Sequence, residues 1–109
     1  NNEHLTIGGC DMVDLAKKHG TPLYVVDEET IRSICRDYQK AFSSYTKVKM
    51  MYASKALCTS AIAKIVASEG LGFDTVSGGE IYTVNKVQPG YPLAWIFHAL
   101  TCQFAVRFR

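Results

Sequence analysis

Lys55 is the side chain whose type and position best suit covalent chemistry in this sequence. It follows the segment 47–53, Lys-Val-Lys-Met-Met-Tyr-Ala, whose alternation predicts a strand with Met51, Ala53 and Lys55 on one face. The carboxyl ends of parallel strands form the rim where α/β proteins bind ligands. A partly desolvated lysine amine there can attack an aldehyde and form a Schiff base, and the small residues Ala53 and Ser54 leave room for a bulky group. The spacing alone also fits a solvated lysine just past a strand, so both interpretations stay open.

Two acidic residues follow at the same level of the next predicted unit. Asp74 lies toward the carboxyl end of the predicted strand 71–76, so its carboxylate can face the same ligand as Lys55; the alternative is a turn or cap carboxylate. Ser77-Gly-Gly-Glu80 has the spacing of a capping box, in which the serine oxygen and the glutamate carboxylate satisfy free N–H groups at a helix start. We therefore expect Glu80 to be a capping residue rather than a catalytic one.

The composition excludes several classes of function. The chain has 109 residues, of which 48% are hydrophobic and 20% charged, and its net charge is +2, so we expect neither a nucleic-acid nor a membrane partner. The 3 histidines show no metal-ligand spacing, and the 4 cysteines form no Cys-x-x-Cys pair, so we expect no metal site and reduced thiols. No apolar run approaches the roughly 18 residues of a membrane span, and we expect no signal peptide.

The first half of the chain is predicted to hold two helices and a strand. Asp11 and Gly20 bound a short helix as its N-cap and C-cap. The segment 21–26 is rich in β-branched and aromatic residues and predicts a first strand. Apolar residues at three- and four-residue spacing then predict a long amphipathic helix. These residues are Ile31, Ile34, Cys35, Tyr38, Ala41, Phe42 and Tyr45.

The second half repeats the strand–helix order. After the strand 47–53, a helix is predicted from Thr59 or Ser60 to Gly70, and a short helix follows Ser77. The predicted strands lie about 25 residues apart, which requires a crossover helix between parallel strands. The sequence therefore predicts an α/β fold and disfavours antiparallel hairpins.

Residue 87 marks a compositional boundary. All 10 acidic residues lie between Glu3 and Glu80, and residues 87–109 contain none. The segment after the boundary carries the whole net charge and is rich in aromatic residues. We therefore predict a domain over residues 1–86 and a divergent tail over residues 87–109.

Four segments of the chain, taken together, resemble one known protein family. They are His4-Leu-Thr-Ile-Gly-Gly-Cys-Asp11, Leu15-Ala16 with Gly20-Thr-Pro-Leu-Tyr-Val-Val-Asp27, Tyr52-Ala-Ser-Lys-Ala56 and Gly70-Leu-Gly-Phe-Asp-Thr-Val-Ser-Gly-Gly-Glu80. In this order and spacing the chain resembles the diaminopimelate decarboxylases over roughly residues 3–86. The alanine racemase-like superfamily shares the Tyr-Ala-x-Lys motif, and the ornithine and arginine decarboxylases are the alternative relatives.

The resemblance implies a pyridoxal phosphate enzyme that removes carbon dioxide from an amino-acid substrate, meso-diaminopimelate, and forms L-lysine. It places Lys55 on the Schiff-base lysine, Ala53 and Asp74 in the cofactor pocket, and Glu80 near the site. It also implies about three βα units of an incomplete (β/α)8 barrel. The family further implies a cytoplasmic homodimer for the full-length enzyme.

The resemblance ends near Lys86. The family's later segments do not follow, among them a His-Gly-Asn-Asn-Lys segment, a glycine-rich phosphate loop and a C-terminal β-domain. We therefore expect the N-terminal portion of such an enzyme, inactive in isolation, and hypothesise that a frameshift or misjoined gene end produced the tail. The alternatives are a truncated product without a competent cofactor site and a small cofactor-binding module that releases no carbon dioxide.

Overall fold

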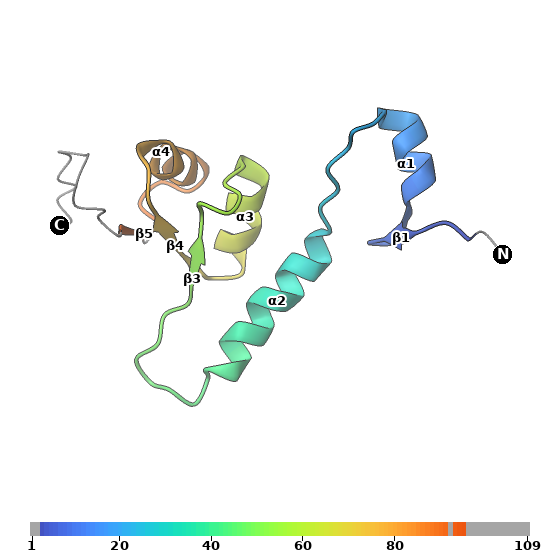
Figure 1. The fold of residues 1–109 in the computed structure, drawn as a ribbon. Helices are drawn as coiled ribbons and strands as arrows, with labels where there is room; N and C mark the ends of the chain where they lie inside the picture. The colour runs from blue at the N-terminus through green and yellow to red at the C-terminus, as the bar shows by residue number, and fades with distance from the viewer. Residues whose placement is uncertain (1–2, 92, 96–109) are drawn as a thin grey trace. The chain divides into compact units, whose positions relative to one another are not determined.

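The computed structural model describes residues 3–91 and 93–95 of the chain (Figure 1). The chain divides into two compact units, Asn1–Val48 and Lys49–Arg109. Each unit has its own sheet: a 2-stranded sheet in the first and a 3-stranded sheet in the second. The α/β fold class is therefore confirmed.

The first unit opens on an antiparallel hairpin. Strand β1 (Thr6–Ile7) pairs with strand β2 (Cys10–Asp11). Gly8 and Gly9 form the two-residue turn with φ angles of 58° and 77°, a left-handed conformation that glycine adopts without a Cβ clash. The prediction that the chain has no antiparallel hairpin is wrong for this segment. It was based on the spacing of about 25 residues between strands, whereas the Gly-Gly pair is a local signal for a hairpin turn.

Helix α1 (Met12–His19) begins and ends where the sequence predicts. The Asp11 carboxylate accepts a hydrogen bond from the Val13 N–H at 2.8 Å and so caps the helix start. At the other end Gly20 has a φ of 82°, which a residue with a Cβ rarely adopts. Both boundaries are thus set by single residues.

Residues 21–26, the first predicted strand, do not form one. The segment is extended between α1 and the next helix, and it pairs with no strand in the part of the chain that the structure describes. Tyr24 is fully exposed. The prediction is wrong because β-branched composition indicates an extended backbone but does not supply the neighbouring strand that completes a ladder.

Helix α2 (Glu28–Ala41) is the predicted amphipathic helix. Asp27 caps it by accepting hydrogen bonds from the Glu29 N–H at 3.1 Å and the Thr30 hydroxyl at 2.7 Å. The helix ends at Ala41, so the predicted stripe does not continue to Tyr45. Within the helix Cys35 is the buried residue.

The second unit is built on three parallel strands. These are β3 (Met51–Ala53), β4 (Gly72–Thr75) and β5 (Leu93–Trp95), in the order β3-β4-β5. The predicted strands 47–53 and 71–76 are confirmed as parallel neighbours, each shorter than expected.

Two helices connect these strands. Helix α3 (Ser60–Ser68) is capped by Thr59, whose hydroxyl accepts from the Ile62 N–H at 3.3 Å. Helix α4 (Gly78–Val87) is capped by Ser77 and ends at the residue where the composition changes. Strand β5 follows in the same sheet, and the domain boundary at residue 87 stays a prediction.

The core of the second unit lies on one face of its sheet. Phe73 on β4 is 0% exposed, and its ring packs edge-on against Tyr52 and Tyr91. The Tyr91 hydroxyl donates to the Ala67 carbonyl of α3 at 3.1 Å, so this helix covers the Phe73 face. Because side chains alternate along a strand, the neighbouring residue Asp74 belongs to the opposite face.

Candidate active site

Lys55 lies in a turn that begins at the last residue of β3. The Ala56 N–H donates to the Ala53 carbonyl at 3.1 Å, so the chain turns before Lys55 can continue the strand pleat. The prediction that Lys55 shares a face with Met51 and Ala53 is therefore wrong. Lys55 stands at the carboxyl end of a parallel strand, as predicted, but its side chain is exposed, and the described residues do not supply the expected desolvation.

Asp74 lies on β4 directly opposite Ala53 in the parallel ladder. The alternative of a turn or cap carboxylate is wrong, because Asp74 is a strand residue whose carbonyl accepts from the Ser54 N–H at 3.1 Å. Its Oδ1 atom is buried and has no hydrogen-bond partner among the described residues. A buried acceptor without a donor costs free energy, so this atom is well placed to receive a donor from a ligand.

The Glu80 carboxylate accepts hydrogen bonds from three groups. Its Oε2 atom accepts from the Val76 N–H at 3.0 Å and from the Ser54 hydroxyl at 2.6 Å. Its Oε1 atom accepts from the Ser77 hydroxyl at 2.9 Å, and the Ser77 oxygen accepts from the Glu80 N–H at 3.3 Å. The predicted capping box is therefore half formed: the serine caps α4, but the glutamate accepts from the Val76 N–H instead of the Ser77 N–H. Glu80 thereby also connects α4 to the turn of Lys55.

These contacts stabilise the charge of Glu80. Burial raises the pKa of Glu80, but the hydrogen bond from Ser54, the other two hydrogen bonds and the positive charge of Lys55 outweigh it and hold the pKa below its usual value. Burial, aided by the negative charge of Glu80, raises the pKa of the Cys58 thiol. At neutral pH the carboxylate is therefore ionised and the thiol is protonated, which makes Cys58 a poor nucleophile.

Ser54 is the site residue that sequence reasoning missed. Its side chain is buried, and its hydroxyl lies 2.8 Å from the Asp74 carbonyl oxygen as well as 2.6 Å from Glu80. The sequence suggested only that Ser54 leaves space beside Lys55. A serine next to the lysine is a weak signal, because its partner Glu80 stands 26 residues further along the chain.

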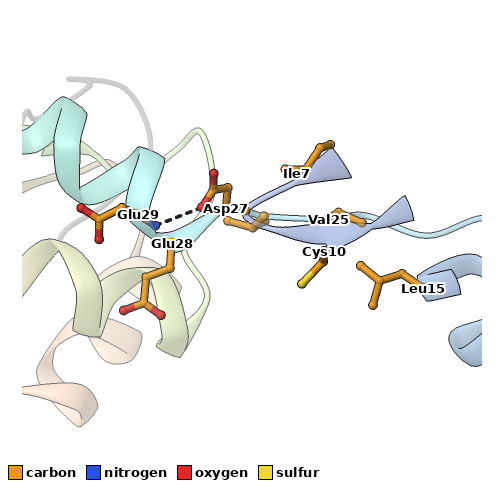
Figure 2. Close-up of a pocket in the computed structure, with 9 residues that line it drawn as sticks. Ile7, Cys10, Leu15, Val25, Asp27, Glu28 and Glu29 are labelled. Atoms are coloured by element: carbon orange, nitrogen blue, oxygen red, sulfur yellow. Dashed lines mark hydrogen bonds between the residues drawn. The ribbon is translucent and has the colours of Figure 1, made fainter. Parts of the chain in front are cut away.

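A separate pocket of about 440 Å³ lies in the first unit (Figure 2). Apolar and acidic residues line it: Ile7, Gly8, Cys10, Leu15, Val25, Val26, Asp27, Glu28 and Glu29. Figure 2 shows the Asp27 carboxylate bonded to the Glu29 N–H at the start of α2. The hydrogen bond from the Thr30 hydroxyl, only partly opposed by burial, lowers the pKa of Asp27. The Asp27 carboxylate therefore caps α2 and is held in place by these hydrogen bonds. None of the predicted site residues lines the pocket.

Within residues 3–91 and 93–95, no three His, Cys, Asp or Glu side chains are grouped so as to hold a metal ion. Cys10, Cys35 and Cys58 form no disulfide among the described residues, and Cys102 lies outside them. No helix in the described part of the chain is long and apolar enough to cross a bilayer.

Parallel strands joined by helices, with a lysine at the carboxyl end of β3, define an α/β protein with polar groups on the rim where such proteins bind ligands. The sequence pattern of the family described as "Pyridoxal-dependent decarboxylase, pyridoxal binding domain" matches residues 28–103. The chain belongs to this family. The matched range includes Lys55, Asp74 and Glu80.

Sequence similarity to individual proteins agrees with the family match. The chain is 45% identical over 97 residues to the diaminopimelate decarboxylase of Bacillus methanolicus, which covers 87% of this chain and 22% of the relative. It is 51% identical over 81 residues to the enzyme of that name from Methanothermobacter thermautotrophicus, covering 73% and 19%. For the Bacillus subtilis enzyme the identity is 46% over 97 residues, covering 87% and 22%. The resemblance is confirmed, but the prediction that it ends near Lys86 is wrong, because the family match continues to residue 103. The chain spans about a fifth of the length of these relatives.

Proposed function

We propose that this chain is part of a diaminopimelate decarboxylase, which converts meso-diaminopimelate to L-lysine and carbon dioxide with pyridoxal phosphate. Lys55 is the proposed catalytic lysine that binds the cofactor. The observation that carries the proposal is the position of Lys55 at the carboxyl end of β3, beside a strand that presents Asp74. The 43–51% identity to enzymes of this name supports the choice of substrate.

The residues at the rim fit pyridoxal phosphate. Asp74 offers a buried acceptor atom without a donor, and the protonated ring of the cofactor carries a donor. Ala53, directly opposite Asp74, has a small and exposed side chain that leaves the adjacent space open. We infer that Lys55, Ala53 and Asp74 together hold the cofactor.

Lys55 performs two tasks in the proposed reaction. Its exposed amine would hold the cofactor through the aldehyde, and the same amine would hold or move a proton at the reacting carbon. When bound, pyridoxal phosphate supplies an aldehyde for a primary amine and a ring that delocalises the electron pair left by carbon dioxide. Asp74 would orient the bound group, and the positive charge of Lys55 contributes to lowering the pKa of Glu80.

Family membership supports further proposals about the whole enzyme. We infer that the β3-β4-β5 sheet is part of a (β/α)8 barrel, since its strands are parallel and α3 and α4 connect them. The homodimer and the cytoplasmic location expected from the resemblance stay predictions. An ornithine or arginine decarboxylase is the alternative, since the family is described only as pyridoxal-dependent decarboxylases.

Cofactor attachment is tested on the 109-residue chain. The purified chain is incubated with pyridoxal phosphate, reduced with borohydride and mapped by peptide mass spectrometry. We expect attachment at Lys55 in clear preference to Lys49 and Lys64, and its loss in Lys55→Ala. Equal labelling of all lysines would contradict the proposed role of Lys55.

Substrate choice is tested in a chimera, in which residues 3–86 replace the matching segment of the Bacillus subtilis relative. We expect release of carbon dioxide from labelled meso-diaminopimelate, and none from the chimera that carries Lys55→Ala. Release from ornithine or arginine instead would favour the alternative. Activity that survives Lys55→Ala would exclude a catalytic role for this lysine.

A further inference from the structure

We propose that Ser54 positions Lys55 for cofactor attachment, because its N–H and its hydroxyl fasten the Lys55 turn to the Asp74 carbonyl and the Glu80 carboxylate respectively. This inference rests on the proposed function, since it assigns a role toward the amine of Lys55. Ser54 is the first residue past β3 and immediately precedes Lys55. A bond to its side chain therefore fixes the turn at the point where it leaves the strand.

Ser54 is the buried anchor of an exposed turn. It is 1% exposed, whereas its neighbours Ala53 and Lys55 are both exposed. Its N–H and its hydroxyl both reach the Asp74 carbonyl oxygen, at 3.1 and 2.8 Å, and the hydroxyl also reaches Glu80 at 2.6 Å. Water does not compete for a hydroxyl this deeply buried, so its hydrogen bonds constrain the turn strongly.

The Ser54 hydroxyl has one proton and two acceptors within reach. A hydrogen bond to an ionised carboxylate is stronger than one to a carbonyl, so the proton belongs to the shorter contact with Glu80. The carboxylate is itself held by the Val76 N–H and the Ser77 hydroxyl at the start of α4. Glu80 is therefore a fixed point to which Ser54 attaches the turn.

The same contact holds a negative charge near the amine. Lys55 and Glu80 lie close enough for their charges to interact. Without the Ser54 hydroxyl, the turn that carries Lys55 loses its hydrogen bond to the carboxylate of α4. Ser54 and Glu80 are thus positioning residues, which act on the reaction through Lys55.

A double-mutant cycle of Ser54→Ala and Glu80→Gln tests this role in the 109-residue chain, with pyridoxal phosphate as the probe. One readout is the rate of attachment at Lys55 relative to Lys49 in the same molecule. The second is the visible circular dichroism of the attached cofactor, which reports how asymmetrically it is held. We expect each single variant to slow attachment at Lys55 about ten- to a hundredfold, the effect of losing a hydrogen bond to a charged group, and to reduce the dichroism.

The double variant distinguishes positioning from general damage. If Ser54 acts through Glu80, the double variant is little slower than Glu80→Gln alone. Ser33→Ala, which removes an exposed serine from α2, is the matched control and leaves both readouts unchanged. Far-ultraviolet circular dichroism checks folding, and Ser54→Cys, which keeps a weak donor of similar size, replaces Ser54→Ala if that variant unfolds.

The outcomes separate this inference from the proposed function. Selective attachment at Lys55 in the wild type, with an unchanged rate and dichroism in the Ser54 variants, overturns the inference and leaves the proposed function standing. Fully additive effects of the two substitutions overturn the claim that Ser54 acts through Glu80. A wild-type chain that shows no preference for Lys55 overturns the proposed function and the inference with it.

Discussion

The Glu80 carboxylate at the start of α4 lies 2.6 Å from the Ser54 hydroxyl at the end of β3. This contact joins two consecutive strand–helix units at the rim where their strands end. Lys55, the next residue, is exposed and has no comparable burial of its own. The position of the lysine therefore depends on its buried neighbour, and the stability of that link can be measured.

Replacing Glu80 by glutamine is expected to lower the free energy of unfolding. A glutamine has one acceptor oxygen instead of two, so it cannot accept from the Val76 N–H, the Ser54 hydroxyl and the Ser77 hydroxyl as the carboxylate does. We expect a loss of about 1 to 2 kcal/mol, the cost of leaving a partly buried donor unpaired. Urea unfolding followed by circular dichroism measures it. Glu3→Gln, at an exposed position, is the control, and equal stability of Glu80→Gln and wild type would contradict the network.

Acid is expected to remove the contribution of Glu80 to stability. Burial raises the pKa of this residue, but the hydrogen bond from Ser54 and the other favourable contacts hold it below its ordinary value of 4.5. As the pH falls, the unfolded chain therefore binds the proton first, and the stabilisation present above pH 4.5 is lost through the folded-state pKa. The difference in unfolding free energy between wild type and Glu80→Gln thus narrows below that pH. Urea titrations at several pH values test this, and a constant difference would refute it.

Sequence signals predicted the helices because each signal lies next to the element it marks. Asp11 and Ser77 both accept a hydrogen bond from a free N–H group within three residues, so capping can be predicted without knowing the fold. The parallel pairing of β3 and β4 was also predicted, since the segment between them is long enough for the crossover helix that parallel strands require.

The sequence did not predict features that depend on residues elsewhere in the chain. Residues 21–26 have strand composition, but composition does not supply a neighbouring strand. The prediction that Lys55 lies on the same strand face as Ala53 is wrong, because the Ala53–Ala56 turn ends the strand before Lys55. The hydrogen bond between Glu80 and Ser54 could not be predicted from the capping-box spacing, because the two residues lie 26 positions apart in the sequence.

Gly8→Ala is expected to destabilise the first unit more than Gly9→Ala. Both glycines have a positive φ, so each substitution costs about 1 kcal/mol in backbone strain. A Cβ on Gly8 would also lie 3.2 Å from Asp27 Oδ1, whereas one on Gly9 meets nothing within 4 Å. Because Asp27 caps α2, its displacement weakens the start of that helix. Amide hydrogen exchange over the first turn of α2 measures the difference, and identical exchange in both variants would contradict the contact.

Asp74→Ala is expected to stabilise the chain in the absence of cofactor. The buried Oδ1 atom has no hydrogen-bond partner among the described residues, and the substitution removes this unsatisfied acceptor. The ladder bonds of β4 are made by its backbone and are retained. We expect a gain of about 1 kcal/mol in the free energy of unfolding, measured in urea without pyridoxal phosphate. Asp37→Ala, at an exposed position on α2, is the matched control and changes stability little.

The same variant is expected to retain pyridoxal phosphate more weakly, because the acceptor proposed to orient it is gone. Dialysis of the loaded chain, with the attached fraction measured after borohydride reduction, gives the retention. The opposite signs of the two effects are informative. Replacing a carboxylate with a purely structural role would lower the free energy of unfolding. Replacing one with no role would change neither the free energy of unfolding nor the retention of the cofactor. A less stable Asp74→Ala would contradict an unsatisfied carboxylate, and unchanged retention in a stabilised variant would contradict its role toward the cofactor. A gain in stability together with a loss of retention is the result that identifies Asp74 as a residue kept for its ligand.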